Sequence, residues 1–203
     1  MTRRFTEPKL VVATHNMGKF AEIERLLEGH PVELVSARAL GLHEPAETET
    51  SFLGNARIKA RHAVEKTGLP AVGDDSGLEI DALHGAPGVY TADWAAQPAG
   101  RDFFHAMEKT WEQLEHAQAP YPRTARFRCA AVLVWPDGHE ETFEGTIEGE
   151  CVHPFRGEDG HGYDPMFQPT GETRTLAEMT ADEKNAISHR GEAFRKLVAA
   201  CFG

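Results

Sequence analysis

The sequence predicts a mixed-sheet α/β fold, and three observations support this. Short apolar runs rich in valine alternate with stretches of helical periodicity, which indicates buried strands between helices. The polar turn PDGH at 136–139 lies between two β-rich runs and is typical of a β-hairpin. Buried strands, a hairpin and interspersed helices in one chain favour a sheet with both parallel and antiparallel pairs.

The first third of the chain is expected to form two strands and two helices. Valine-rich runs indicate the strands, and apolar residues at helical spacing indicate the helices. Ser51 is a suitable N-cap for the second helix, and Gly68 and Pro70 are stop signals after it. The expected strands are Leu10–Ala13 and Val32–Val35, and the expected helices are Phe20–Leu27 and Ser51–Lys66.

The central segment GDDSG, at 73–77, is interpreted as a tight turn, because two acids and a serine lie between glycines. Ala71 and Val72 would enter this turn as a strand, and Leu78 and Ile80 would leave it as another. The segment HGAPG at 84–88 then breaks the chain.

The second half is expected to supply a helix, a long hairpin and two further helices. Thr180 and Glu183 fit a capping box that opens a short helix. An apolar stripe ending at Cys201 indicates the last helix. The other expected elements are a helix at about Arg101–Glu115 and hairpin strands at Phe127–Trp135 and Glu140–Ile147.

Composition limits the functional classes. The 203 residues, 40% of them hydrophobic, suffice for one compact domain. A formal net charge of -11 argues against broad binding to nucleic acid. Three scattered cysteines do not form a disulfide framework, so we expect a reducing cytoplasm. The N-terminal residues lack the pattern of a signal peptide or a membrane span, and no membrane partner is expected.

A candidate phosphate site lies where the first strand passes into the first helix. Thr14 and Asn16 can donate hydrogen bonds to phosphate oxygens, and Lys19 adds a positive charge. Backbone N–H groups at a helix start favour an anion. The alternative is an ordinary turn chosen for backbone geometry, since this is not the P-loop pattern.

Asp74 and Asp75 form a candidate metal site. Two adjacent carboxylates repel one another unless a cation or a proton intervenes. Mg²⁺ prefers oxygen ligands and keeps several waters, which leaves room for substrate phosphates. One acid can anchor the ion while the other removes a proton from water. The alternative is a turn in which an aspartate only accepts backbone hydrogen bonds.

Two further clusters are weaker by themselves. In the first, His161, Gly162, Tyr163 and Asp164, glycine lets the backbone approach a ligand and a ring could cover a base, although such a segment is more often a loop. The second contains three potential cations that could grip phosphate or a purine carbonyl, or could simply form a solvated face or complement a helix C-terminal dipole. Its members are Lys184, Ser188, His189 and Arg190.

Taken together, five segments in order resemble the inosine triphosphate pyrophosphatases, also called the Ham1-like or non-standard purine nucleoside triphosphate pyrophosphatases. The likeness runs from Leu10 to about Leu197. The segments are ATHNMGKFAEI, SFLGNARIKA, AVGDDSGLEIDALHGAPGVY, GHGYDPMF and EKNAISHRGEAF. The resemblance implies an elongated mixed β-sheet flanked by helices, forming two lobes with a central cleft in a single domain of residues 1–203. It also implies a homodimer and Mg²⁺-dependent cleavage of ITP, dITP or XTP to the monophosphate and pyrophosphate.

The resemblance also implies a role for each matching residue. Asp75 would be the general base that prepares water for attack, and Asp74 and Asp75 would hold Mg²⁺. Ser76 would touch the substrate. The triphosphate would be held by Thr14, Asn16, Lys19 and Lys59, and the base by His161, Gly162, Tyr163, Asp164, Lys184, His189 and Arg190.

Three positions depart from the family pattern. Gly54 stands where the family has a glutamate, which leaves Glu47 or Glu49 as a substitute acid. His161 replaces a phenylalanine that stacks on the base, and Asp93 replaces an arginine.

These departures keep two other functions open. One is a related pyrophosphatase with a different base specificity. The other is a nucleotide-binding protein with reduced catalysis.

Overall fold

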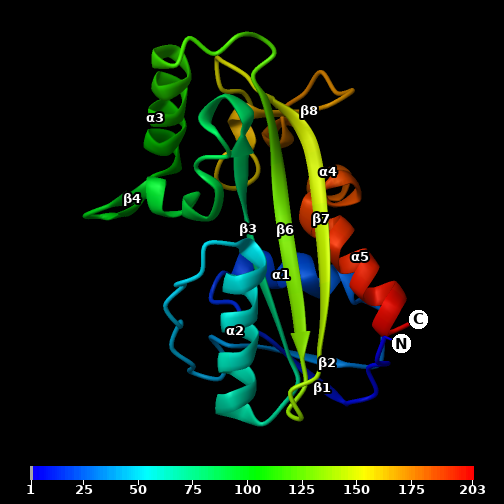
Figure 1. Cartoon of the computed structure of the whole chain (residues 1–203). Coiled ribbons are helices and arrows are strands. Elements are labelled where there is room, and N and C mark those ends of the chain that lie inside the picture. Colours follow the sequence, from blue (N-terminus) through cyan, green and yellow to red (C-terminus); the bar gives the residue numbers. More distant parts are fainter. Residues whose placement is uncertain (1) are drawn as a thin grey trace. The chain divides into compact units, whose positions relative to one another are not determined.

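The computed structural model describes residues 2–203, and it is a six-stranded mixed sheet with five α-helices (Figure 1). The strand order in the sheet is β2-β1-β3-β6-β7-β8, and β4 and β5 form a separate pair. The helices are α1 Met17–Leu26, α2 Phe52–Thr67, α3 Phe103–His116, α4 Ala181–Ile187 and α5 His189–Cys201. The strands are β1 Lys9–Val12, β2 Glu33–Ser36, β3 Ala71–Ile80, β4 Ala96–Gln97, β5 Gly100–Arg101, β6 Thr124–Val134, β7 Glu140–Cys151 and β8 Phe167–Pro169.

The expected mixed α/β class is confirmed by the strand pairing. β1 pairs in parallel with both β2 and β3, whereas β7 and β8 pair antiparallel. Of the helices in residues 2–203, none has the length and apolar character needed to cross a bilayer.

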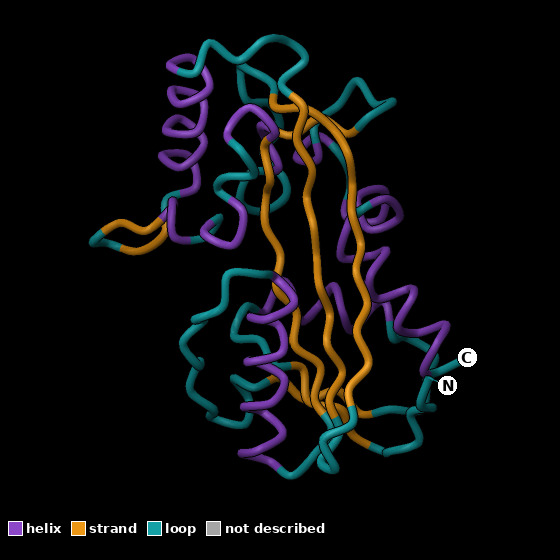
Figure 2. The backbone as a smooth tube through the Cα atoms, viewed as in Figure 1, coloured by secondary structure: helices purple, strands orange, loops and turns teal. Residues whose placement is uncertain are grey.

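The chain divides into two compact units, each with its own core. The first unit comprises residues 1–75, 129–145 and 190–203, and the second comprises residues 76–128 and 146–189. The three long strands β3, β6 and β7, drawn in orange in Figure 2, each contribute residues to both units.

In the first unit, the two faces of the sheet have different partners. Leu10 and Val12 of β1 and Val72 of β3 pack in one cluster with α1 and α5. Val11 of β1 and Ala71 of β3 instead pack with α2. Successive side chains of a strand point to opposite faces, so even-numbered β3 residues up to 74 face α1 and α5, and odd-numbered ones face α2.

Local signals set the ends of the two helices that flank β3. The Asn16 side chain caps α1 by accepting hydrogen bonds from the backbone N–H groups of Gly18 and Lys19. Helix α1 therefore begins before the predicted position at Phe20. Ser51 caps α2, and Gly68 ends it in the left-handed conformation at φ 68°, both as predicted.

The tight turn predicted at 73–77 is wrong, because these residues form the middle of the ten-residue strand β3. Gly73 has a packing role instead. A Cβ atom at this position would lie 2.4 Å from the Ala56 carbonyl oxygen and 2.8 Å from the Ala60 nitrogen, both in α2. Glycine thus lets helix and strand approach closely.

The second unit packs α3 against the outer parts of the long strands. Leu78 and Ile80 of β3 lie in its core with Met107 and Leu114 of α3 and Phe167 of β8. The predicted helix at 101–115 is confirmed with a slightly later start, and Asp102 caps it. Both strands of the predicted hairpin are longer than expected.

The last predicted elements are also confirmed. Thr180 and Glu183 form the expected capping box at the start of α4. The C-terminal stripe belongs to α5, where Phe194 and Leu197 are fully buried. Cys129, Cys151 and Cys201 are buried free thiols.

Candidate active site

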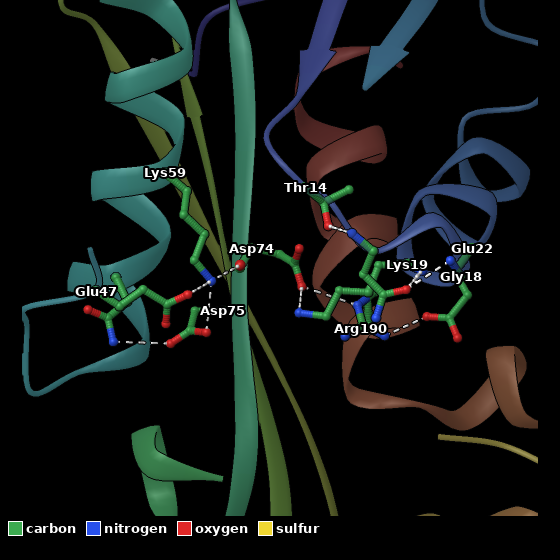
Figure 3. A network of polar contacts seen from close by, with 11 residues as sticks. Thr14, Gly18, Lys19, Glu22, Glu47, Lys59, Asp74, Asp75 and Arg190 are labelled. Carbon is green, nitrogen blue, oxygen red and sulfur yellow. Dashed lines mark hydrogen bonds and ion pairs between the residues drawn. The ribbon is translucent and has the colours of Figure 1, made fainter. Parts of the chain in front are cut away.

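The charged residues around Asp74 and Asp75 form two groups on opposite faces of β3 (Figure 3). Asp75 points toward α2, where it meets Lys59, and Asp74 points toward α1 and α5, where it meets Lys19 and Arg190. This division follows from the alternation of side chains along the strand. The two acids that are adjacent in sequence therefore have separate partners.

On the α2 face, two carboxylates converge on one ammonium group. Lys59 Nζ lies 3.1 Å from Asp75 Oδ1 and 2.9 Å from Glu47 Oε1. The same nitrogen donates to the backbone carbonyl of Asp74 at 3.0 Å. Asn55, one turn before Lys59 on α2, donates its side-chain amide to Asp75 Oδ2 at 3.4 Å. Each carboxylate oxygen of Asp75 thus accepts a hydrogen bond from a side chain of α2.

The environment of the α2 face shifts two pKa values. Burial raises the pKa of the Asp75 carboxyl above its ordinary value; the Lys59 ammonium opposes this shift, and the charge of Glu47 reinforces it. Burial alone would lower the pKa of Lys59, but the surrounding carboxylates raise it, so Lys59 stays charged. A carboxylate with a raised pKa, held beside a fixed cation, has the properties of a general base.

On the opposite face, Asp74 is paired with two cations. Its Oδ2 atom accepts from Lys19 Nζ at 3.2 Å and from Arg190 Nε at 3.3 Å. Arg190 also donates through Nη1 to Glu22 of α1. Only 4% of Asp74 and 8% of Arg190 are exposed, so these ion pairs lie largely away from solvent.

These ion pairs fix the charge states of the second group. Burial alone would raise the pKa of Asp74, but Lys19 and then Arg190 hold it far below its ordinary value. Burial alone would lower the pKa of Arg190, whereas Asp74 and Glu22 raise it. The group therefore contains permanent opposite charges at neutral pH.

The start of α1 supplies the polar groups that the sequence predicted there. Thr14 Oγ1 accepts a hydrogen bond from the Asn16 backbone N–H at 3.2 Å. The carbonyl oxygen of the Asn16 side chain is used in capping, at 2.9 Å from Gly18 N and 3.2 Å from Lys19 N. The Asn16 amide group and the Thr14 hydroxyl remain the donors that could serve an anion beside Lys19.

Asp74 and Asp75, which were expected to hold Mg²⁺ together, point to opposite faces of β3 (Figure 3). Asp75 shares Lys59 with Glu47 instead. Within residues 2–203, no group of three or more histidine, cysteine, aspartate or glutamate side chains is arranged to hold a metal ion. A metal bound here would need water or substrate oxygens to complete its ligands.

Glu47 and Glu49 were the two candidates to replace the family glutamate at position 54, and their contacts differ. Glu47 reaches Lys59, as described above. The Glu49 side chain lies against Gly54, where an added Cβ would be 2.6 Å from Glu49 Cβ. Glu47 is therefore the acid that belongs to the Asp75 group, and the small residue at 54 accommodates Glu49.

In the second unit, the predicted segment 161–164 is organised by one aspartate. Asp164 Oδ2 lies 2.7 Å from Lys184 Nζ and accepts the His161 backbone N–H at 2.6 Å. Gly162 adopts φ 70°, a conformation that favours glycine. Tyr163 is a core residue, only 1% exposed, and burial raises its pKa to about 12. Its ring is thus used in packing, while His161 is exposed.

Two adjacent residues of the predicted cluster near the C-terminus, His189 and Arg190, have different partners. His189 stacks on Phe127 in the second unit, with ring centroids 5.0 Å apart and planes at 13°. Arg190 belongs to the Asp74 group of the first unit. Ser76, the residue after Asp75, is half-buried at the start of the second unit's share of β3.

Two residues of the site were not among the sequence-based candidates. Asn55 lies four residues before Lys59 on α2, and Glu22 lies three residues after Lys19 on α1. Both spacings place the pair on one helix face. A search for polar residues three or four positions from Lys19 and Lys59 in the sequence could therefore have found both residues.

Comparisons with known proteins identify the family of this chain. The profile of the Ham1 family matches residues 10–200. A protein of Ruegeria pomeroyi named dITP/XTP pyrophosphatase is 56% identical over 203 residues, covering 100% of both chains. One of the same name from Zymomonas mobilis is 52% identical over 200 residues, covering 98% of this chain and 95% of its own.

Solved structures show the same fold. A Ham1 protein from Coxiella burnetii superposes with a TM-score of 0.88 at 38% identity, covering 95% of this chain and 98% of its own. A nucleoside-triphosphatase, or dITP/XTP pyrophosphatase, from Mycobacterium abscessus gives 0.77 at 43% identity, covering 94% and 98%. The chain therefore belongs to the Ham1 family.

Proposed function

We propose that this protein hydrolyses non-standard purine nucleoside triphosphates, namely ITP, dITP and XTP, to the monophosphate and pyrophosphate, and so removes them from the nucleotide pool. The observation that carries the proposal is the buried carboxylate of Asp75, held 3.1 Å from the Lys59 ammonium beside Glu47. Relatives about half identical over the whole chain carry the name dITP/XTP pyrophosphatase.

In the proposed reaction, Asp75 accepts a proton from the attacking water. The water oxygen bonds to the α-phosphorus, and the bond from that phosphorus to the bridging oxygen breaks. Pyrophosphate then leaves with the bridging oxygen. The raised pKa of Asp75 suits this role, because a base is most effective when its pKa lies closer to the working pH.

The positive side chains stabilise negative charge during this step. Lys59 lies beside the base, and Lys19 and the Asn16 amide lie at the start of α1, a favourable place for phosphate oxygens. Asp74 acts in this scheme by holding Lys19 and Arg190. Thr14 adds a hydroxyl next to Asn16.

We propose Mg²⁺ as the cofactor. Glu47 and Asp75 fit it, because two carboxylates that already converge on a cation offer the oxygen donors that Mg²⁺ prefers. When bound, the ion would neutralise charge on the phosphates and on the departing pyrophosphate. Asp74, which was also expected to bind the ion, forms ion pairs with Lys19 and Arg190.

Base recognition is proposed for the second unit. Lys184 and His189 would contact the purine and favour its 6-oxo group. The exposed ring of His161 would lie against the base, with Gly162 allowing close approach of the backbone, and Asp164 orients Lys184. Arg190 would add a further contact to the nucleotide, and Ser76 would touch it next to the general base.

Release of pyrophosphate is the direct test. Purified protein with Mg²⁺ should release pyrophosphate from dITP and XTP much faster than from dATP or dGTP. Faster release from another triphosphate would favour the related pyrophosphatase with a different base specificity. Tight ITP binding without turnover over a range of Mg²⁺ and Mn²⁺ concentrations would favour the nucleotide-binding protein.

We also propose a homodimer that works in the cytoplasm. The family resemblance supports the dimer, and three buried free cysteines are compatible with a reducing compartment. Light scattering coupled to size-exclusion chromatography should give about twice the 22.4 kDa chain mass. A monomer at enzyme working concentration would contradict this.

A further inference from the structure

Glu22 occupies an unusual position for an acid in a site that must attract a polyphosphate. It lies on α1 three residues after Lys19, and its side chain is 17% exposed. Glu22 accepts a hydrogen bond from Arg190 Nη1, and Asp74 accepts one from Arg190 Nε (Figure 3). The guanidinium is thus held at two of its nitrogens by carboxylates from different elements.

Stability alone is a poor explanation for this arrangement. Removing two charges from water costs several kcal/mol per ion, and mutual attraction repays this only with good geometry. Asp74 already neutralises one of the two neighbouring cations, Lys19 and Arg190. A second, partly buried acid lowers the positive potential that would draw a nucleotide, so its presence needs another explanation.

That explanation is orientation. A guanidinium is planar, and its N–H groups point in fixed directions. Contact through Nε alone leaves the plane free to swing around that contact, whereas a second carboxylate at Nη1 fixes it.

We propose that Glu22 is a positioning residue: together with Asp74 it fixes the guanidinium of Arg190 in the orientation that meets the nucleotide. The inference rests on the proposed function, since it assigns Glu22 to the same site. Glu22 itself touches no reacting atom in this scheme. The negative charge of Glu22 weakens the attraction between the site and the phosphates. The oriented Arg190 strengthens nucleotide binding by more than this loss.

The test compares Glu22→Ala and Glu22→Gln with wild type in dITP hydrolysis. We expect Glu22→Ala to raise KM about tenfold while kcat changes by less than about threefold, as for lost binding shared by ground and transition states. Glu22→Gln keeps an acceptor oxygen and should recover part of the loss. Glu24→Gln is the matched control, because Glu24 is exposed on the same helix and loses the same charge.

Three results would overturn the inference. KM could stay unchanged in a folded Glu22→Ala protein, it could fall because a negative charge has gone, or Glu24→Gln could raise it equally. If Glu22→Ala does not fold, Glu22→Gln decides by the same KM comparison. Failure of the proposed function looks different, because wild type itself would then release no pyrophosphate from dITP.

Discussion

Lys59 Nζ lies 3.1 Å from Asp75 Oδ1, and the lysine comes from α2 while the aspartate comes from β3. The contact depends on how closely helix and strand approach. It places a fixed positive charge beside the proposed general base without giving that base the low pKa of an ordinary ion pair, because burial and Glu47 act against the lysine.

Asp75→Asn should abolish most of the activity while leaving the fold intact. The amide has nearly the same shape but accepts no proton from water. General-base catalysis typically contributes 10²–10⁴-fold, so we expect kcat for dITP to fall about 10³-fold. Pyrophosphate release measures this, and Asp137→Asn in the exposed turn between β6 and β7 is the control. Undiminished turnover in Asp75→Asn would reject the assignment.

Lys59→Met should reveal the proposed metal ligands. Without the ammonium, Asp75 and Glu47 face each other as uncompensated charges, and breaking a buried ion pair costs about 3 kcal/mol of unfolding free energy. Added Mg²⁺ should restore part of this loss in chemical unfolding experiments, because a cation returns between the carboxylates. The exposed Lys66→Met variant on the same helix is the control. Equal stabilisation by Mg²⁺ in both variants would contradict the proposed ligands.

Asp74 should make stability depend on acid pH. Its pKa in the folded protein lies below the ordinary 3.8, so its contribution is present above that pH and is lost as the pH falls toward the folded pKa. The unfolding free energy of wild type should exceed that of Asp74→Asn by about 3 kcal/mol near neutral pH. The difference should narrow only below pH 3.8. Urea unfolding at several pH values tests this, and a gap that widens in acid would show that the sign is wrong.

Gly73→Ala should be strongly destabilising although it adds one methyl group. The new Cβ would lie 2.4 Å from a backbone oxygen of α2, which has no flexible end to move aside. Overpacking of this kind costs about 2–3 kcal/mol. Activity should fall as well, because the helix that carries Lys59 is displaced. Stability within about 0.5 kcal/mol of wild type would show that α2 can shift freely.

His161→Phe should strengthen binding of oxopurine nucleotides. The His161 ring is exposed, and a phenyl ring offers more apolar area for stacking on a base. Aromatic pairs contribute about 0.5–1.5 kcal/mol beyond area burial, so KM for dITP should fall roughly threefold to tenfold. His161→Ala is the companion variant and should raise KM. If neither substitution changes KM, the ring is not beside the base.

The elements that sequence predicted well are those determined locally. Ser51 and Gly68 bound α2 because capping and left-handed backbone need only neighbouring residues. The valine-rich strand near Val11 and the apolar stripe around Phe194 were equally clear from periodicity. Their identification required no knowledge of distant contacts.

The turn expected at 73–77 shows where local reasoning fails. Glycine beside aspartate usually favours a turn, but Gly73 is required by α2, which comes earlier in the chain. The interpretation of Asp74 and Asp75 as one pair followed from that error. The spacing from Lys19 could have placed Glu22 on the same helix face, but it could not have identified its partner Arg190, which is 168 positions away in sequence. Only the folded chain brings them together.

Because side chains alternate between the two faces of β3, the site is sensitive to insertions and deletions in this strand. Inserting or deleting a single residue just before Asp74 would move each acid to the other side of the strand, provided that the rest of the pairing held. The base would then sit among arginine and lysine, which would suppress its ability to take up a proton. Asp74 would then face Lys59 and Glu47, and it would no longer pair with Lys19 and Arg190. The face of the sheet on which each aspartate lies therefore depends on its exact position along β3. A one-residue shift would disrupt the site without changing which residue types the protein contains.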